Sequence, residues 1–147
     1  MTVRRDLRFH ADLFWDGESG AEVNAGRFPG LKLDMPVEFG GKGRYPCPDE
    51  LFLAAIGGCL LTTFLHFKKK LNVNVAEFEI SINGRLRGDT EGYKIAGIEA
   101  VISARAKKND EKGLRRCIRL AKEYCHITRT LGKTVPIEIA DRISFVD

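Results

Sequence analysis

Hydrophobic and polar positions alternate in the first third of this chain of 147 residues, about residues 1–45. Residues 7–15 and 31–35 follow the period of two that is typical of half-buried β-strands, and a weaker strand is expected around residues 21–25. The glycine-rich residues 39–46 are typical of a loop. The first third therefore predicts a strand meander followed by a loop.

The next segment, residues 48–70, predicts a helix with apolar residues on every face. A proline suits its first turn, and Asp49 and Glu50 complement the helix dipole there. A helix that is apolar all round is buried on all sides, and a domain of this size rarely encloses so long a helix by itself. The Gly57-Gly58 pair costs roughly 2 kcal/mol against two alanines. Close packing against a partner chain is therefore expected.

The C-terminal part, about residues 75–147, alternates again. Residues 75–86 and 93–106 predict an antiparallel hairpin with one face in water, joined by a glycine-containing turn. Asn109 is expected to cap a second, amphipathic helix that runs to about Tyr124. This part therefore continues with strands and then a helix.

A short helical segment is expected to end at Leu131, before a glycine. Residues 135–139 predict a last strand that residues 143–146 extend. No internal repeat or linker interrupts the pattern, so residues 1–147 predict a single domain. The element order predicts an α+β fold with antiparallel sheets packed on the long central helix.

The composition agrees with an ordinary globular domain. Hydrophobic residues make up 44% and charged residues 30%, which excludes disorder and collagen-like repeats. The net charge of +4 comes from short basic clusters that suit solvated helix faces, so no nucleic-acid partner is expected. We find no run of about 18 apolar residues and no signal peptide, so we expect no membrane span and a cytoplasmic location.

Four cysteines are the main candidates for chemistry: Cys47, Cys59, Cys117 and Cys125. A cytosolic chain does not keep structural disulfides. No C-x-x-C pair is present, which argues against a zinc knuckle and a thioredoxin-type motif, and no metal or other cofactor is predicted. The thiols are therefore either inert and buried or reactive.

Both interpretations stay open for Cys59, in the middle of the apolar helix, and for Cys125, at the end of the second helix. Burial would make Cys59 inert, whereas a nearby cation would favour its thiolate. Lowering a thiol pKa from about 8.5 to about 6 takes roughly 3.4 kcal/mol. Cys125 is either a core residue or a resolving thiol that attacks a sulfenic acid at Cys59. His126 is a candidate base beside Cys125.

Two runs of the sequence resemble motifs of a known protein family. The run Pro48–Cys59 resembles the helix motif of the OsmC/Ohr family, the osmotically inducible and organic hydroperoxide resistance proteins, and Ala121–Ile127 resembles that family's second-cysteine motif. The resemblance covers nearly the whole chain. It implies an intertwined homodimer with the long helices at its centre, and a stress-response thiol peroxidase that reduces organic hydroperoxides with a dithiol reductant. It also implies that Cys59 is the peroxidatic thiol and Cys125 the resolving thiol.

This chain departs from the family at the arginine of the first hairpin turn, where Trp15 stands. Arg27 and Arg44 are the candidates to replace that arginine as substrate-binding cations. The family's glutamate at the helix start aligns with Asp49, and Glu50 follows it, so either acid is a candidate to orient a cation. The chain therefore resembles a divergent branch of the family.

The helix geometry adds a constraint on an acid–thiol site. Glu50 and Cys59 are nine residues apart, about 13.5 Å along one helix. They cannot meet within one chain, so Glu50 or Asp49 would have to come from the partner across a two-fold axis. This agrees with an obligate dimer.

Three functions remain as hypotheses. The first is a cysteine-based organic hydroperoxide reductase that forms a Cys59–Cys125 disulfide. The second is a binding protein that holds a thiol, thioester or acyl ligand in an interface pocket without turnover. The third is a structural dimer without chemistry. The reactivity of the Cys59 thiol toward peroxide distinguishes them.

Overall fold

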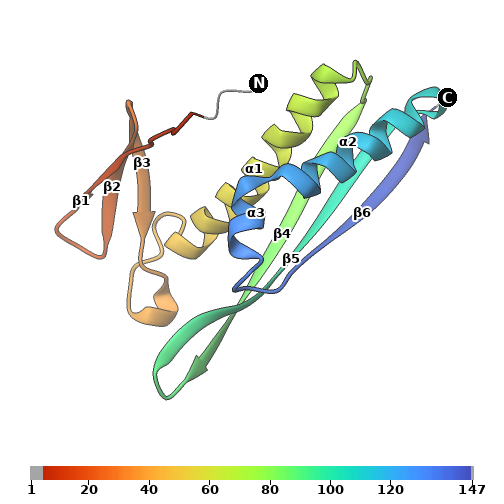
Figure 1. The fold of residues 1–147 in the computed structure, drawn as a ribbon. Helices are drawn as coiled ribbons and strands as arrows, with labels where there is room; N and C mark the ends of the chain where they lie inside the picture. Colours follow the sequence, from red (N-terminus) through yellow and green to blue (C-terminus); the bar gives the residue numbers. More distant parts are fainter. Residues whose placement is uncertain (1–4, 147) are drawn as a thin grey trace. The chain divides into compact units, whose positions relative to one another are not determined.

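The computed structural model of the protein describes residues 5–146. Residues up to Leu51 form one compact unit and those from Phe52 onward form another. In chain order, the strands and α-helices are β1 (Ala11–Trp15), β2 (Gly20–Ala25), β3 (Phe28–Asp34), α1 (Pro48–Lys70), β4 (Glu77–Asp89), β5 (Gly92–Lys107), α2 (Glu111–Tyr124), α3 (His126–Leu131) and β6 (Ile137–Val146) (Figure 1). The α+β class predicted from the sequence is confirmed.

The first unit contains the predicted meander, an antiparallel sheet in the order β1-β2-β3. Its first strand is shorter than the predicted residues 7–15. Ala11 pairs with Ala25 at the end of β2, and the Gly26 N–H then donates to the His10 carbonyl as the chain turns back. The ladder between β1 and β2 therefore ends at Ala11, and residues 5–10 are not part of a strand.

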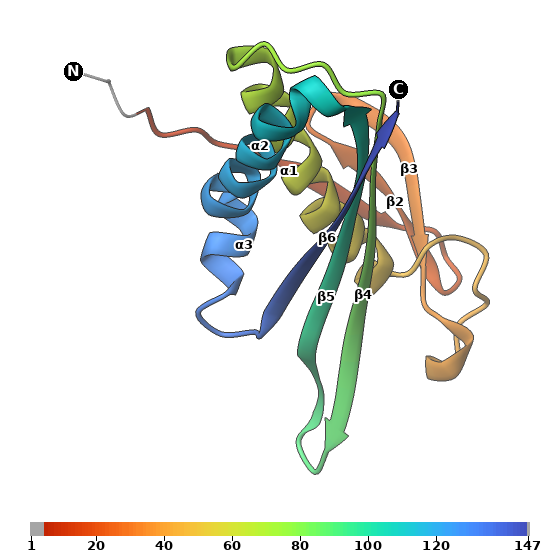
Figure 2. The ribbon, with the colours of Figure 1, turned by 90° about the vertical axis from the view of Figure 1, so that its right-hand side faces the viewer.

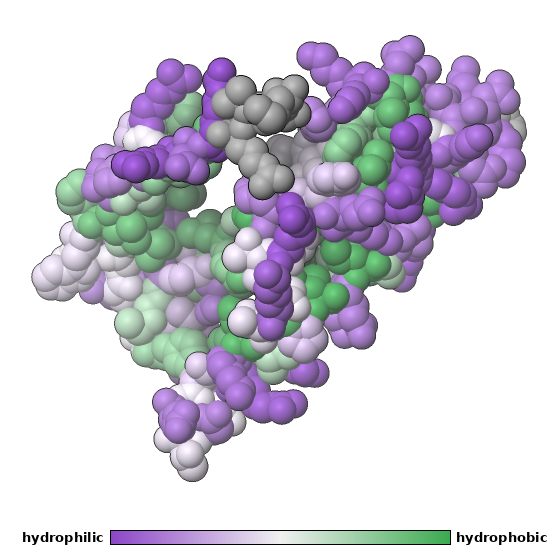
Figure 3. Space-filling view, in the orientation of Figure 1, coloured by the Kyte–Doolittle hydropathy of each residue, from purple (hydrophilic) through white to green (hydrophobic). Residues whose placement is uncertain are grey.

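The β1-β2-β3 sheet buries little apolar surface. Val23 is its buried hydrophobic side chain, whereas Phe9, Trp15 and Phe28 are 90%, 76% and 66% exposed. Figure 3 shows the resulting hydrophobic surface, in green, over this sheet. Exposed apolar surface of this extent marks an interaction surface rather than a finished domain face.

A polar network holds the first unit together instead. The Asp34 carboxylate is fully buried and accepts from Arg44 Nε at 2.8 Å and from the Ser19 hydroxyl at 2.6 Å. The Arg44 guanidinium also pairs with Asp16 at 2.6 Å and with Glu18 at 2.5 Å. The hydrogen bonds from Arg44 and then Ser19 hold the pKa of Asp34 well below its ordinary value. The network ties the first hairpin turn to the loop after β3.

The second unit is a three-stranded sheet in the order β4-β5-β6, with helices on one face (Figures 1 and 2). Phe64 of α1 stacks on Phe78 of β4 with 3.9 Å between ring centroids, and Leu114 of α2 joins the same buried cluster. Every second side chain of β5 faces these helices and is buried: Ile98, Ala100, Ile102, Ala104 and Ala106. The predicted alternation of this hairpin therefore identifies the core face correctly.

The second sheet differs from the prediction in the direction of its last strand. β4 and β5 are antiparallel, but β6 runs parallel to β5, with Ile98 opposite Ile137 and Lys107 opposite Val146. The prediction that the sheets are antiparallel is therefore wrong for this pair. A parallel pair needs a crossover of a dozen or more residues, which α2 and α3 supply here. Alternation along a strand carries no information on its direction.

The start of the second helix also differs from the prediction. Lys108–Asp110 form a turn of 3₁₀-helix, and α2 begins at Glu111 with Asp110, not Asn109, in the cap position. The Asp110 carboxylate accepts a hydrogen bond from the Asn74 N–H at 3.3 Å rather than from its own helix. The predicted ends of α1, α2 and α3 agree with the structure.

α1 is buried on one side only. Its buried side chains, Ile56, Cys59, Leu60 and Phe64, recur at spacings of three and four residues. Ala54, Leu61 and Leu65 are exposed, and a Cβ added at Gly58 would meet no atom within 4 Å. The second unit by itself therefore does not bury α1 all round, although the sequence predicts a helix that is buried on all sides.

By length and composition alone, α1 could cross a membrane, which the sequence analysis did not expect. An 18-residue window has a mean hydropathy of 1.6, with 28% of it buried in the structure. A core helix of a soluble protein passes the same test. The packing of Leu60 and Phe64 on the sheet accounts for one side of α1 without a membrane.

Asp34→Asn is expected to weaken the first unit in a pH-dependent way. Because the folded pKa of Asp34 is lowered, its carboxylate adds stability that is fully present above about pH 4 and is lost as the pH falls toward the folded pKa. The difference in unfolding free energy between wild type and variant should therefore be largest near neutral pH and shrink in acid. Urea titrations followed by the fluorescence of Trp15, the single tryptophan, measure it.

Glu22→Gln, an exposed change on the same sheet, is the matched control and should alter neither the stability nor its pH dependence. A wild-type-to-Asp34→Asn difference that stays constant from neutral pH to about pH 3 would contradict the role of the Asp34 charge.

Candidate active site

Cys59 lies in the middle of α1, on the side that packs against the second sheet. Its side chain belongs to a small buried cluster with Leu60, Ala100 and Cys125. Cys59 follows Ile56 by three residues, so both side chains lie on the buried side of α1. The apolar pattern that packs α1 on the sheet therefore also buries the thiol.

Cys125 joins this cluster because the chain bends there. α2 ends at Tyr124 and α3 begins at His126, and Cys125 between them has φ −63° and ψ 109°, which is extended backbone. Its N–H still donates to the Ala121 carbonyl at 3.0 Å. The bend brings the fully buried Cys125 side chain into the same cluster as Cys59, close enough to raise the pKa of the Cys59 thiol.

The first residue of α3 also reaches Cys59. The Sγ atom of Cys59 lies 3.7 Å from Nδ1 and 3.9 Å from Nε2 of His126. The His126 side chain is exposed, whereas Cys59 is only 7% exposed. The imidazole therefore connects the buried sulfur with the outside of the unit.

The immediate surroundings set the protonation of Cys59. Burial raises the pKa of the Cys59 thiol most, and the neighbouring Cys125 raises it further. The Ile127 N–H and the Thr63 hydroxyl act in the opposite direction, since both stabilise a thiolate. The pKa of Cys59 is raised on balance, so the resting group is a protonated thiol.

No cation is among the main influences on Cys59 in the second unit. Among residues 52–146, the groups that shift its pKa most are Ile127, Cys125 and Thr63, and its sulfur contacts His126; none of these is an arginine or a lysine. The arrangement thus offers a nucleophilic sulfur, a second thiol in contact with it and an imidazole. These groups suit thiol–disulfide chemistry.

The two arginines predicted to bind substrate, Arg27 and Arg44, both make contacts within the first unit. Arg44 is held by Asp34, Asp16 and Glu18, and its pKa is raised by Asp34 and then Asp16. Arg27 is exposed, with its guanidinium 5.3 Å from the centroid of its neighbour's ring, Phe28. Arg44 therefore has no unpaired charge to offer a thiolate unless these ion pairs break.

The two acids at the start of α1 differ. Glu50 Oε1 accepts a hydrogen bond from the Cys47 N–H at 3.1 Å, and this bond lowers the pKa of Glu50. Because Cys47 precedes the helix and Glu50 is its third residue, this is the glutamate half of a capping box. The structure records no such bond for Asp49. Glu50 thus has a local role in starting the helix.

Cys117 has the surroundings of a core residue. It is fully buried in α2, in a different cluster from Cys59, and burial raises the pKa of its thiol. All four cysteines are free thiols. Among the described residues, no group of three or more His, Cys, Asp or Glu side chains is arranged to hold a metal ion.

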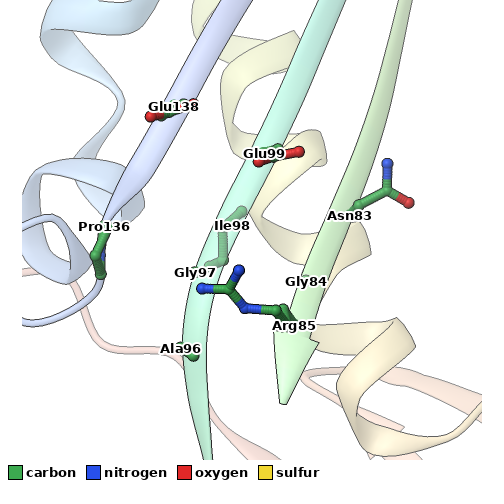
Figure 4. Close-up of a pocket in the computed structure, with 9 residues that line it drawn as sticks. All are labelled: Asn83, Gly84, Arg85, Ala96, Gly97, Ile98, Glu99, Pro136 and Glu138. Atoms are coloured by element: carbon green, nitrogen blue, oxygen red, sulfur yellow. The ribbon is translucent and has the colours of Figure 1, made fainter. Parts of the chain in front are cut away.

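A separate hollow of about 380 Å³ lies on the second sheet (Figure 4). Its lining combines Arg85 with Glu99 and Glu138, and Gly84 and Gly97 also border it. It contains no cysteine or histidine. It therefore lacks the groups that make the Cys59 cluster a candidate for chemistry.

The sequence analysis missed the contact between His126 and Cys59. It placed His126 beside Cys125, its neighbour in the chain, as a candidate base. The sequence shows that His126 directly follows Cys125, which already suggested a histidine near a thiol. The bend between α2 and α3 decides that the imidazole contacts Cys59 of α1.

The fold resembles those of several solved proteins. A hypothetical protein from Aquifex aeolicus VF5 matches with a TM-score of 0.79 at 20% identity, covering 97% of this chain and 100% of that one. The organic hydroperoxide resistance protein OsmC from Legionella pneumophila matches with a TM-score of 0.72 at 20% identity, covering 94% and 98%. OhrB of Bacillus subtilis, an organic hydroperoxide resistance protein, has a TM-score of 0.64 at 20% identity, covering 92% and 98%. At such identities the likeness establishes the fold alone.

No match was found among curated proteins. A comparison of the sequence with protein families does place the chain in one. The profile of the family described as OsmC-like protein matches residues 41–140, which is more than half of the chain and includes both Cys59 and Cys125. The resemblance found in the two cysteine motifs is therefore confirmed, and the chain belongs to the OsmC-like protein family.

Proposed function

We propose that this protein is a thiol peroxidase that reduces organic hydroperoxides. The observation that carries the proposal is the contact between Cys59 and Cys125, two free thiols from distant parts of the chain that share one buried cluster. Family membership and the names of the Legionella and Bacillus relatives support the same activity.

In the proposed reaction, the Cys59 thiolate attacks the distal oxygen of ROOH. The O–O bond breaks, the sulfur becomes a sulfenic acid, and the alkoxide leaves and takes up a proton to give the alcohol. The Cys125 thiol then attacks the sulfenic sulfur, water leaves, and a disulfide joins the two cysteines. A dithiol reductant restores both thiols and is itself oxidised to a disulfide.

The surroundings of the thiols favour an organic peroxide over hydrogen peroxide. Leu60 and Ala100 are fully buried in the Cys59 cluster, and Ile127 packs against it with part of its apolar surface exposed. An alkyl chain gains free energy when it leaves water for such a surface, at about 25 cal/mol per Å² of buried apolar area, whereas hydrogen peroxide has no chain to bury.

The residues predicted to orient the substrate remain part of the proposal. Arg27 is the candidate cation whose charge is not matched by a carboxylate, whereas Arg44 would have to leave its three acidic partners. Asp49 or Glu50 of a partner subunit would hold such a cation by a bidentate pair. The cytoplasmic location also stays a prediction from the sequence.

We also propose a homodimer. The exposed face of α1 carries Ala54, Leu61 and Leu65 around Gly58, where small residues let a second backbone approach. The hydrophobic surface over β1-β2-β3 is a second face that needs cover. A second copy of the chain would bury both kinds of surface and remove their contact with water.

One observation favours the alternative that the site binds a thiol, thioester or acyl ligand without turnover. Burial raises the pKa of Cys59, and a protonated thiol is a poor nucleophile. An inert Cys59 with a ligand in the apolar cluster would be the signature of that function.

Oxidation by a hydroperoxide tests the proposed reaction directly. Cumene hydroperoxide should consume the thiols of Cys59 and Cys125 together and link them by an intramolecular disulfide that peptide mass spectrometry identifies. Cys59→Ser should abolish the reaction, and Cys125→Ser should leave a sulfenic acid that dimedone traps. Cys117→Ser is the matched control and should oxidise like wild type.

Undiminished peroxide consumption by Cys59→Ser would show that the nucleophile lies elsewhere. A wild-type Cys59 that keeps its free thiol under excess hydroperoxide would favour the ligand-binding alternative.

The dimer is tested at one glycine of α1. Light scattering of the wild type at micromolar concentration should give about twice the chain mass of 16.4 kDa. Gly58→Glu fits a single chain, because no atom lies within 4 Å of the added Cβ, but it would bury an unpaired charge between two helices. We therefore expect this variant to be monomeric or to dimerise at least tenfold more weakly.

Gly57→Ala is the control, because its Cβ would make ordinary contacts with Ile80 and Ile82 of its own chain at 3.8 to 3.9 Å. It should remain dimeric. A monomeric wild type, or a Gly58→Glu variant as tightly associated as wild type, would rule out α1 as the interface.

A further inference from the structure

The imidazole of His126 is the one basic side chain that reaches the Cys59 sulfur within the second unit, residues 52–146. Its two nitrogens lie at nearly equal distances from Sγ, 3.7 and 3.9 Å. The sulfur therefore faces the ring between its two nitrogens, and turning the ring directs one of them at the sulfur.

The remaining neighbours of Cys59 are unable to take its proton. Cys125 presents a second buried thiol, which is a weak hydrogen-bond acceptor, and the Thr63 hydroxyl donates to the Cys59 carbonyl. The Ile127 backbone contributes only an N–H donor. A reaction that begins from a protonated Cys59 thiol therefore needs the imidazole.

We propose that His126 is the catalytic base and acid of this site: it accepts the proton of Cys59 as the sulfur attacks the peroxide, and it donates that proton to the departing alkoxide. This inference rests on the proposed peroxidase function. It assigns the activation of the Cys59 thiol to a histidine, whereas the sequence predicted an arginine for this role.

The step balances in protons and electrons. The Cys59 thiol passes its proton to the neutral imidazole, and the resulting thiolate attacks the distal peroxide oxygen. Two electrons move from sulfur to the O–O bond, which breaks, so that sulfur is oxidised to the sulfenic acid and the hydroperoxide is reduced. The imidazolium returns its proton to the alkoxide, so the alcohol leaves and His126 is neutral again.

The position of His126 suits both halves of this transfer. Cys59 is buried and His126 is exposed, so the imidazole spans the route between the sulfur and an incoming peroxide. His126 begins α3, directly after Cys125 in the chain, and its ring contacts the Cys59 sulfur. Imidazole is also the side chain that changes charge between pH 5 and 8, which lets it work in both directions near neutrality.

Two measurements on the full-length protein test the assignment. The first is the rate of cumene hydroperoxide consumption. The second is the rate at which iodoacetamide alkylates Cys59, followed for its own peptide by mass spectrometry from about pH 5 to pH 9.5. The variants are His126→Gln and His126→Phe. His10→Gln, at an exposed histidine of the first unit, is the matched control.

In the wild type, the alkylation rate should rise with pH through an inflection that depends on His126, because the imidazole accepts the thiol proton only after losing its own. In both His126 variants this inflection should vanish, leaving only the rise of a buried thiol above about pH 8.5. Peroxide consumption near pH 7 should fall about 100-fold or more, the usual contribution of a general acid–base group. His10→Gln should match the wild type in both measurements.

The other outcomes separate a failure of the His126 assignment from a failure of the peroxidase proposal. If the wild type reduces the hydroperoxide and both His126 variants keep its rate and pH profile, His126 is not the base and the peroxidase proposal stands. If the wild type does not react with the hydroperoxide but loses the alkylation inflection in the variants, the peroxidase function fails while His126 remains the base of Cys59. A wild type that lacks both the reaction and the inflection overturns both.

Discussion

The structure of the second unit depends on one constraint, the need of α1 to bury an apolar surface that covers the whole helix. One side is satisfied by the sheet, where Leu60 and Phe64 pack against β4 and β5. The same side carries Cys59, so docking the helix and burying the thiol are one event. The opposite side, around Gly58, is not covered by the second unit itself. Burial of apolar area is the dominant favourable term in folding, which makes this face the strongest reason to expect a partner.

Burial of Cys59 creates a chemical problem as well as a stable core. In the proposed peroxidase, an apolar site suits an alkyl peroxide but disfavours a thiolate, and burial raises the pKa of Cys59. The bend at Cys125 addresses it by placing a second thiol inside the cluster and an imidazole at its edge. A basic group that takes the proton only during the reaction avoids the cost of keeping a charge buried at rest.

The first unit is stabilised in the opposite manner. Its small sheet buries Val23 but otherwise leaves its large apolar side chains exposed, and its order comes from the buried Asp34 carboxylate with Arg44 and Ser19. A fully hydrogen-bonded buried carboxylate is tolerated because each of its oxygens has partners. This network also explains why Arg44, an attractive cation in the sequence, is committed to its own unit.

The sequence by itself determined the bounds of α1, the ends of α2 and α3, the core face of the β4–β5 hairpin and the two cysteine motifs of the family. Periodicity, caps and local motifs depend on neighbours along the chain, so they can be read without coordinates. Only the tertiary structure decided the parallel direction of β6, the acidic partners of Arg44 and the contact of His126 with Cys59. Each of these joins residues that are far apart in sequence, and no local pattern records which side chain a bend or a crossover will bring opposite another.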